Sequence, residues 1–342
     1  MLFPLLSLSC GRQGDSPAGG QGEFKFQTEQ FADIRILRYQ VPGFDELSGQ
    51  QQKLVYYLYQ AGLSGRDIIW DQNYRYNLRI RKALENIYRT TSAVKSGEEW
   101  EAFLTYIKRV WFSNGIHHHY SKVKIIPGFS TAYFRDLAAK SDAEGFGLRE
   151  GETLSDYLDF LVPLIFDPEV DGKKVVLDSD VDQIAASATN YYSPDLTQAE
   201  VEAFYRKVIV PDDPRPVSYG LNSKLVKENG QIKEKVWKVG GMYSGAIERI
   251  VGWLEKAVEV AENDRQRAAL EKLVEYYRSG DLKTFDEYNI LWVQDTDSAV
   301  DLTNGFIEVY EDPLGYRGSY ESLVSFRDNE ASRRIAALSA NA

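Results

Sequence analysis

The stretch Val217-Ser-Tyr-Gly-Leu-Asn-Ser-Lys-Leu-Val-Lys-Glu-Asn-Gly-Gln-Ile-Lys-Glu-Lys-Val-Trp-Lys-Val239 predicts a β-hairpin in a chain whose other patterns are mostly helical. Two apolar runs flank Asn229-Gly230, and Asn-Gly is a strong hairpin signal because both turn positions need a positive φ. Apolar residues at helical spacing follow in two stripes: Ile247, Ile250, Val251, Leu254, Val258 and Ala261, then Leu270, Leu273, Val274 and Tyr277. The predicted fold class is therefore α+β, mainly helical with a minority of antiparallel strands.

Further elements are predicted on both sides of the hairpin. Capping boxes, in which Ser or Thr is followed three residues later by an acidic or amide side chain, mark helix starts at Ser48/Gln51, Ser96/Glu99, Thr153/Asp156 and Thr197/Glu200. A short strand is expected over residues 34–41 and another over 306–310. A turn over 312–315 and a helix from Asp328 complete the pattern.

Composition and charge exclude several classes of protein. With 342 residues, 43% hydrophobic and 27% charged, the chain matches a globular protein rather than a disordered or membrane-spanning one. The net charge is −11, and basic residues alternate with acidic ones. Nucleic-acid binding is not expected, because its affinity depends on clustered Lys and Arg.

The N-terminus contains the single cysteine, Cys10, so neither an intrachain disulfide nor a cysteine-based zinc site is possible. An apolar run ending at Cys10 resembles a bacterial lipoprotein signal, and Cys10 would be the lipidated residue. The alternatives are an apolar N-terminus without such a role, or a start codon placed too far downstream; a cell-envelope and a cytoplasmic location both stay open. We expect residues 1–22 to be this segment plus a Gly/Ser/Pro tether, and residues 23–342 to form one lobe.

The histidines are contiguous, His117-His118-His119. Sequence neighbours converge on one ion only if the backbone folds sharply, and a catalytic zinc site needs about three protein ligands. We therefore predict a polar loop, or a loop that lines a cleft, and no metal ligand. The chain has no His-Glu-x-x-His, no Gly-x-Ser-x-Gly and no Walker loop.

Five segments carry a resemblance to a known family. Leu291-Trp-Val-Gln-Asp295 is followed by Gly305-Phe-Ile-Glu-Val-Tyr-Glu-Asp-Pro-Leu-Gly-Tyr-Arg-Gly318. This resembles the dipeptidyl-peptidase III family, which carries W-[IV]-Q-D and then G-F-I-E-x-Y-x-D-P-x-G-x-R-G. Its bacterial members are similar at Tyr76-Asn-Leu-Arg-Ile-Arg81, Val110-Trp-Phe-Ser-Asn-Gly-Ile-His-His-His-Tyr120 and Tyr219-Gly-Leu-Asn-Ser-Lys-Leu-Val226.

The resemblance implies a two-lobed zinc metallopeptidase that removes dipeptides from the N-termini of peptides. One lobe carries zinc on an H-E-x-x-G-H helix, and the other has a small antiparallel β-barrel core. The chain resembles most of the barrel lobe, incomplete at its C-terminal end, so the resemblance implies an N-terminal fragment without the zinc lobe. Zinc is expected in the complete enzyme, while this chain alone is expected to bind none and to be inactive.

The resemblance also assigns candidate site residues. Glu308 matches the glutamate that binds the substrate's ammonium, and Tyr310 matches the catalytic tyrosine that reaches the scissile carbonyl. Tyr120 and His119 fall where the family lines the pocket for the second residue from the cut, and Trp292 is expected near the cleft. Glu311 stands where some relatives have a basic residue.

The expected partners are short peptides with free N-termini, with a membrane tether if Cys10 is lipidated. Two other functions stay open: a non-catalytic peptide-binding lipoprotein and a truncated product without function.

Overall fold

A computed structural model describes residues 24–341 and divides the chain into two compact units, Met1–Gln40 and Val41–Ala342. In the first unit, β1 (Gln27–Phe31) and β2 (Ile34–Leu37) form an antiparallel hairpin. Cys10 and the predicted tether lie outside the described residues. None of the helices in residues 24–341 combines the length and the apolar character that crossing a bilayer requires.

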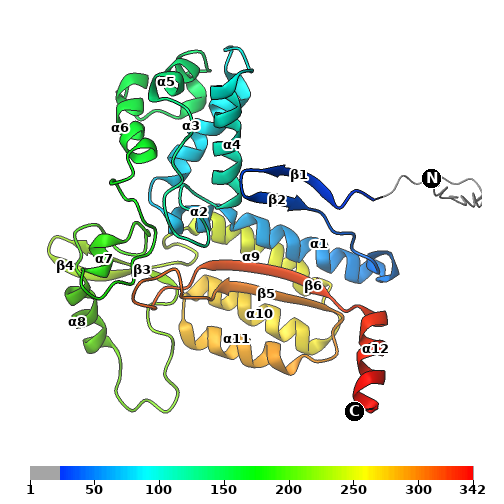
Figure 1. Ribbon diagram of the computed structural model, residues 1–342. Coiled ribbons are helices and arrows are strands. Elements are labelled where there is room, and N and C mark those ends of the chain that lie inside the picture. Colours follow the sequence, from blue (N-terminus) through cyan, green and yellow to red (C-terminus); the bar gives the residue numbers. More distant parts are fainter. Residues whose placement is uncertain (1–23, 342) are drawn as a thin grey trace, which may run out of the picture. The chain divides into compact units, whose positions relative to one another are not determined.

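The second unit contains two hydrophobic cores, and the first is built mainly by helices, with buried residues of the connecting segments such as Ile125 and Phe129. The helices around it are α2 (Arg66–Asn73), α3 (Asn77–Thr90), α4 (Glu98–Phe112), α5 (Thr131–Ala139) and α6 (Leu154–Phe166), with the 3₁₀ turn η2 (Glu144–Phe146). Figure 1 shows α3 to α6 gathered together. Aromatic and aliphatic side chains fill this core, among them Phe103, Ile107, Phe134, Leu161 and Ile165.

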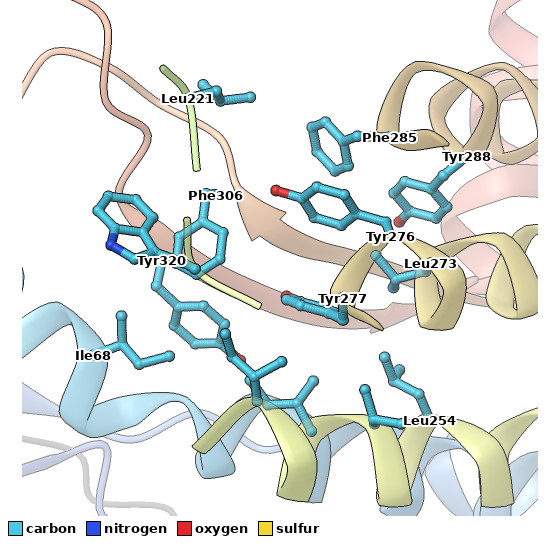
Figure 2. Packing of buried hydrophobic residues seen from close by; sticks show 14 of the residues in the cluster. Ile68, Leu221, Leu254, Leu273, Tyr276, Tyr277, Phe285, Tyr288, Phe306 and Tyr320 are labelled. Carbon is cyan, nitrogen blue, oxygen red and sulfur yellow. The ribbon is translucent and has the colours of Figure 1, made fainter. Parts of the chain in front are cut away.

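The second core lies between helices and the β5–β6 hairpin. It is enclosed by α1 (Gly49–Ser64), α8 (Gln198–Val208), α9 (Ser244–Glu259), α10 (Asp264–Ser279), α11 (Leu282–Gln294), β5 (Val300–Phe306) and β6 (Tyr320–Phe326). Both predicted apolar stripes point into it, from α9 and α10. Figure 2 shows Phe306 and Tyr320 of the hairpin packed with Tyr277 of α10, at ring-centroid distances of 6.4 Å (Phe306–Tyr277) and 5.9 Å (Phe306–Tyr320).

The predicted barrel core is wrong. The strands in the described residues form three separate two-stranded sheets, β1–β2, β3 (Ser223–Glu228) with β4 (Gln231–Val236), and β5–β6. None of the three closes into a barrel. The physical reason is that β5 and β6 pack on α1 and α2, and Phe306 of β5 contacts Tyr277 of α10, so helices rather than further strands cover the hairpin.

Most local predictions agree with the structure. The β3–β4 turn has Asn229 at φ 52° and Gly230 at φ 76°, as the Asn-Gly signal requires. Capping boxes begin α1, α6 and α8 at the predicted residues. The box at Ser96 is wrong, because α4 begins after Gly97, whose φ of 94° suits glycine and leaves Ser96 outside the cap.

The remaining elements are η1 (Phe44–Glu46), α7 (Gln183–Ala186) and α12 (Asn329–Ala340), whose N-cap is Asp328 as predicted. The strand predicted over 306–310 is displaced, since β5 ends at Phe306. Residues 307–319 therefore form the connection between β5 and β6, and this connection carries the candidate site.

Candidate functional site

The segment that follows β5 alternates exposed and half-buried side chains. The Ile307 amide donates to the Ser319 carbonyl at 3.0 Å, and the Ser319 amide donates to the Glu308 carbonyl at 2.9 Å, so strand-like pairing continues past β5. Glu308 and Tyr310 are exposed, whereas Ile307 and Val309 are half-buried. The two candidate site residues therefore share one side of the segment, as their spacing predicts.

A second carboxylate, Glu321, lies beside this segment. Glu321 is the second residue of β6 and pairs with Gly305 of β5. Its Oε1 atom is buried and has no hydrogen-bond partner. Burial, and then the charge of Glu308, raises the pKa of Glu321, and a hydrogen bond between the Glu308 backbone and the Glu321 carboxylate partly offsets this rise. Two carboxylates close together, one with an unpartnered buried oxygen, are suited to bind a cation that donates hydrogen bonds.

Sequence reasoning did not find Glu321. It lies three residues past the Gly305–Gly318 motif, and only the antiparallel register of β5 and β6 brings it near Glu308. The pKa of the Tyr310 hydroxyl is raised, first by burial and then by the carboxylates of Glu311, Glu308 and Glu321. Tyr310 is therefore a protonated hydrogen-bond donor at neutral pH.

The turn after Tyr310 is fixed by buried polar groups. Asp312 accepts hydrogen bonds from the Tyr192 hydroxyl at 2.8 and 2.9 Å, and from the backbone amides of Leu314, Tyr316 and Arg317 at 3.1, 2.8 and 2.9 Å. Arg317 is fully buried. Its guanidinium carbon lies 4.8, 5.0 and 5.8 Å from the ring centroids of Tyr192, Tyr205 and Tyr316.

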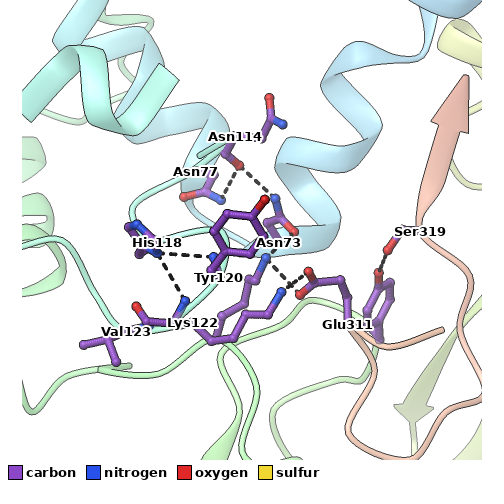
Figure 3. Close-up of polar contacts among 12 residues, drawn as sticks. Asn73, Asn77, Asn114, His118, Tyr120, Lys122, Val123, Glu311 and Ser319 are labelled. Atoms are coloured by element: carbon purple, nitrogen blue, oxygen red, sulfur yellow. Dashed lines mark hydrogen bonds and ion pairs between the residues drawn. The ribbon is translucent and has the colours of Figure 1, made fainter. Parts of the chain in front are cut away.

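Glu311 connects the segment to two lysines from distant parts of the chain. Its carboxylate pairs with Lys122, and with Lys174 at 2.9 Å. Lys174 is 3% exposed and also donates to Asn73 Oδ1 at the end of α2, at 3.2 Å. The Lys122 ammonium lies 5.1 Å from the centroid of the Tyr310 ring. Figure 3 shows the Glu311 carboxylate joined to lysine ammonium groups, with Tyr120 on the same loop as Lys122.

In the histidine loop, His117 is buried, His118 and His119 are half-buried, and Tyr120 is exposed. His117 is buried, its Nε2 atom lies 2.7 Å from the Asp171 carbonyl oxygen, and burial lowers its pKa to about 4. His118 Nδ1 accepts hydrogen bonds from the backbone amides of Tyr120 and Ser121 at 3.2 and 3.1 Å. This arrangement fits the predicted polar loop.

Two predicted substrate-binding residues lie in that loop. The His119 and Tyr120 rings are 4.2 Å apart between centroids, and Tyr120 is 83% exposed. Lys122 carries the connection from this loop to Glu311 and the Tyr310 ring. The structure thus brings the loop of His119 and Tyr120 to the segment of Glu308 and Tyr310.

Trp292 occupies a different place. Its Nε1 atom donates to Asp301 Oδ1 at 2.7 Å, and its ring lines a cavity of about 480 Å³ together with Ile307 and Val309. Because Ile307 and Val309 alternate with Glu308 and Tyr310, this cavity lies on the other side of the segment. The structure does not bring Trp292 together with Glu308.

The described residues also bear on zinc, which the resemblance implies. Across residues 24–341 there is no group of three or more His, Cys, Asp or Glu side chains that could hold a metal ion. These residues do not fit a catalytic zinc ion, whose site takes about three protein ligands.

Known proteins match this chain in sequence and in fold. The family described as Peptidase family M49 matches residues 218–342. Dipeptidyl peptidase 3 of Dictyostelium discoideum is 24% identical over 73% of this chain and 36% of its own length; that of Nematostella vectensis is 23% identical over 91% and 47%. A solved structure, DPP III from Caldithrix abyssi, superposes with a TM-score of 0.56 at 18% identity, covering 87% of this chain and 43% of its own.

The chain spans less than half of the length of these relatives. The M49 match includes Glu308, Tyr310 and Glu321, and the curated relatives extend the similarity over most of the chain. The family match and the curated relatives together support placing the chain in the dipeptidyl-peptidase III family of peptidases.

Proposed function

We propose that this chain supplies the peptide-binding part of a dipeptidyl-peptidase III-like exopeptidase, and that Glu308 and Glu321 bind the free ammonium group of the peptide. The observation that carries the proposal is the buried, unpartnered Oε1 of Glu321 beside Glu308. An ammonium group has three donors, so it can satisfy this oxygen and the Glu308 carboxylate together.

The spacing of Glu308 and Tyr310 matches the length of the dipeptide that the enzyme would remove. Two residues apart in extended backbone, they are separated by about 6.6 Å along the segment. An extended dipeptide spans at most about 7 Å. A peptide bound to Glu308 through its ammonium would thus present the carbonyl of its second residue near Tyr310.

Tyr310 would act on that carbonyl. Its raised pKa keeps the hydroxyl protonated, and a protonated phenol can donate a hydrogen bond to an oxygen that becomes negative during attack. Zinc belongs to the proposal for the complete enzyme, but because the described residues do not fit a zinc site, no step of the mechanism is derived through it.

The test is calorimetric binding of one tetrapeptide in two forms, with a free and with an acetylated N-terminus. Loss of a charge-assisted hydrogen bond costs about 1.5–3 kcal/mol, so we expect acetylation to weaken binding by about 10- to 150-fold. Equal affinity for both forms would refute ammonium recognition.

The same samples are incubated and analysed by mass spectrometry. We expect the chain, which contains no H-E-x-x-G-H sequence, to bind the peptide without releasing a dipeptide. Dipeptide release by this chain, together with one bound zinc per chain, would show that the catalytic groups lie elsewhere and would bring His117, His118 and His119 back into consideration.

A further inference from the structure

The cluster of Lys122, Lys174 and Glu311 has an unbalanced charge. Two ammonium groups share the Glu311 carboxylate, and Glu311 itself is 7% exposed. With both lysines protonated, the three side chains sum to +1. The cluster lies next to Tyr310, and the charges of Glu308 and Glu321 also act on the Tyr310 hydroxyl.

The two lysines differ in what a ligand could reach. Lys174 is 3% exposed and is held by Asn73 as well as by Glu311, which is the arrangement of a scaffold residue. The Lys122 side chain is 18% exposed and lies over the ring of Tyr310, which is itself 61% exposed. The positive charge is therefore accessible at Lys122.

We propose that Lys122 is a specificity-determining residue that favours peptides with an acidic second residue and disfavours those with a basic one. The inference rests on the proposed function, in which the ammonium group binds at Glu308 and the second residue lies near Tyr310. Lys122 is beside Tyr310 and two residues from Tyr120, so it meets the side chain of that second residue. Glu311 tempers the preference, because it partly neutralises Lys122.

The experiment compares two tetrapeptides with free N-termini, Ala-Glu-Ala-Ala and Ala-Arg-Ala-Ala, by calorimetric binding. We expect the wild-type chain to bind the glutamyl peptide about three- to fivefold more tightly, the range for a partly exposed charge pair. Lys122→Ala should abolish this ratio, and Lys122→Arg should keep it. The matched control is Lys256→Ala, since Lys256 also lies over an aromatic ring, Trp253, at 4.1 Å on α9, and it should leave the ratio unchanged.

Glu311→Gln separates an electrostatic role from a merely structural one. Removing the shared carboxylate should raise the preference for the glutamyl peptide, whereas Lys122→Ala lowers it. A ratio unchanged in Lys122→Ala, or lowered in both variants, would overturn the proposal. If Lys122→Ala does not fold, Lys122→Gln combined with Glu311→Gln gives the same test, and a retained preference would again overturn it.

Acetylated forms of both peptides keep the two proposals distinguishable. If acetylation leaves binding unchanged while the ratio still depends on Lys122, ammonium recognition fails and the role of Lys122 as a charge selector stands. If acetylation weakens binding but the ratio ignores Lys122, the specificity proposal fails and the peptide site stands.

Discussion

Two adjoining parts of one motif behave in opposite ways. Residues 307–310 present Glu308 and Tyr310 to solvent, while residues 312–317 bury Asp312 and Arg317 among tyrosine rings and backbone amides. The histidine loop repeats the contrast, with His117 buried and Tyr120 exposed. Residues next to each other in one motif can therefore have different roles. The buried ones hold the backbone in place, and the exposed ones are available to a ligand.

Arg317→Ala is the substitution with the largest expected effect, and it tests the structural role of the buried residues 312–317. The substitution removes a fully buried side chain and its contacts with three rings, so we expect a loss of about 3–5 kcal/mol in the free energy of unfolding. Arg317→Met should cost less, because it keeps most of the volume. Urea unfolding measures the free energy of unfolding of both variants. If Arg317→Ala kept the stability of the parent but lost peptide binding, Arg317 would be a ligand-binding residue instead of a structural one.

The pH dependence of stability sharpens the contrast within the histidine loop. Burial lowers the pKa of His117 from 6.5 to about 4, so below pH 6.5 the unfolded chain binds a proton that the folded chain does not. Stability is complete above pH 6.5 and falls as the pH drops towards 4, by about 3 kcal/mol for this residue.

The measurement is the urea midpoint of the parent and of His117→Gln at pH 7.5 and pH 4.5. We expect the variant to be less stable than the parent at pH 7.5 and the difference to shrink at pH 4.5. A difference that stays constant between the two pH values would show that His117 does not titrate as a buried residue.

Tyr310→Phe tests the exposed half of the motif. A phenylalanine keeps the ring over which Lys122 lies and removes the hydroxyl, so stability should change little. In the complete enzyme, kcat should fall on the order of 100-fold with a smaller change in KM, because an oxyanion donor acts mainly in the transition state. Steady-state kinetics decides this, and a normal kcat with a raised KM would make Tyr310 a substrate contact only.

Local structure could be predicted because its causes are local. The Asn229-Gly230 turn, three capping boxes and the stripes of α9 and α10 depend on residues a few positions apart. The shared side of Glu308 and Tyr310 also follows from spacing alone. The box at Ser96 is wrong because the positive φ of Gly97 ends the turn one residue later than the pattern suggests.

The features that the sequence could not predict depend on contacts between residues far apart in the chain. The barrel was inferred from the family resemblance and not from these residues, and the β5–β6 hairpin packs on helices instead. Glu321 reaches the site through strand register. Lys122 and Glu311 are 189 residues apart in sequence, so no spacing pattern connects them.

The central claim, that Glu308 binds a free N-terminus, is tested most directly by combining Glu308→Gln with acetylation of one peptide in a thermodynamic cycle. Four dissociation constants are measured by calorimetry: parent and variant, each with the free and the acetylated peptide. We expect Glu308→Gln to weaken binding of the free peptide by about 10- to 150-fold and to leave binding of the acetylated peptide unchanged. Equal weakening of both peptides, or no weakening of either, would contradict it.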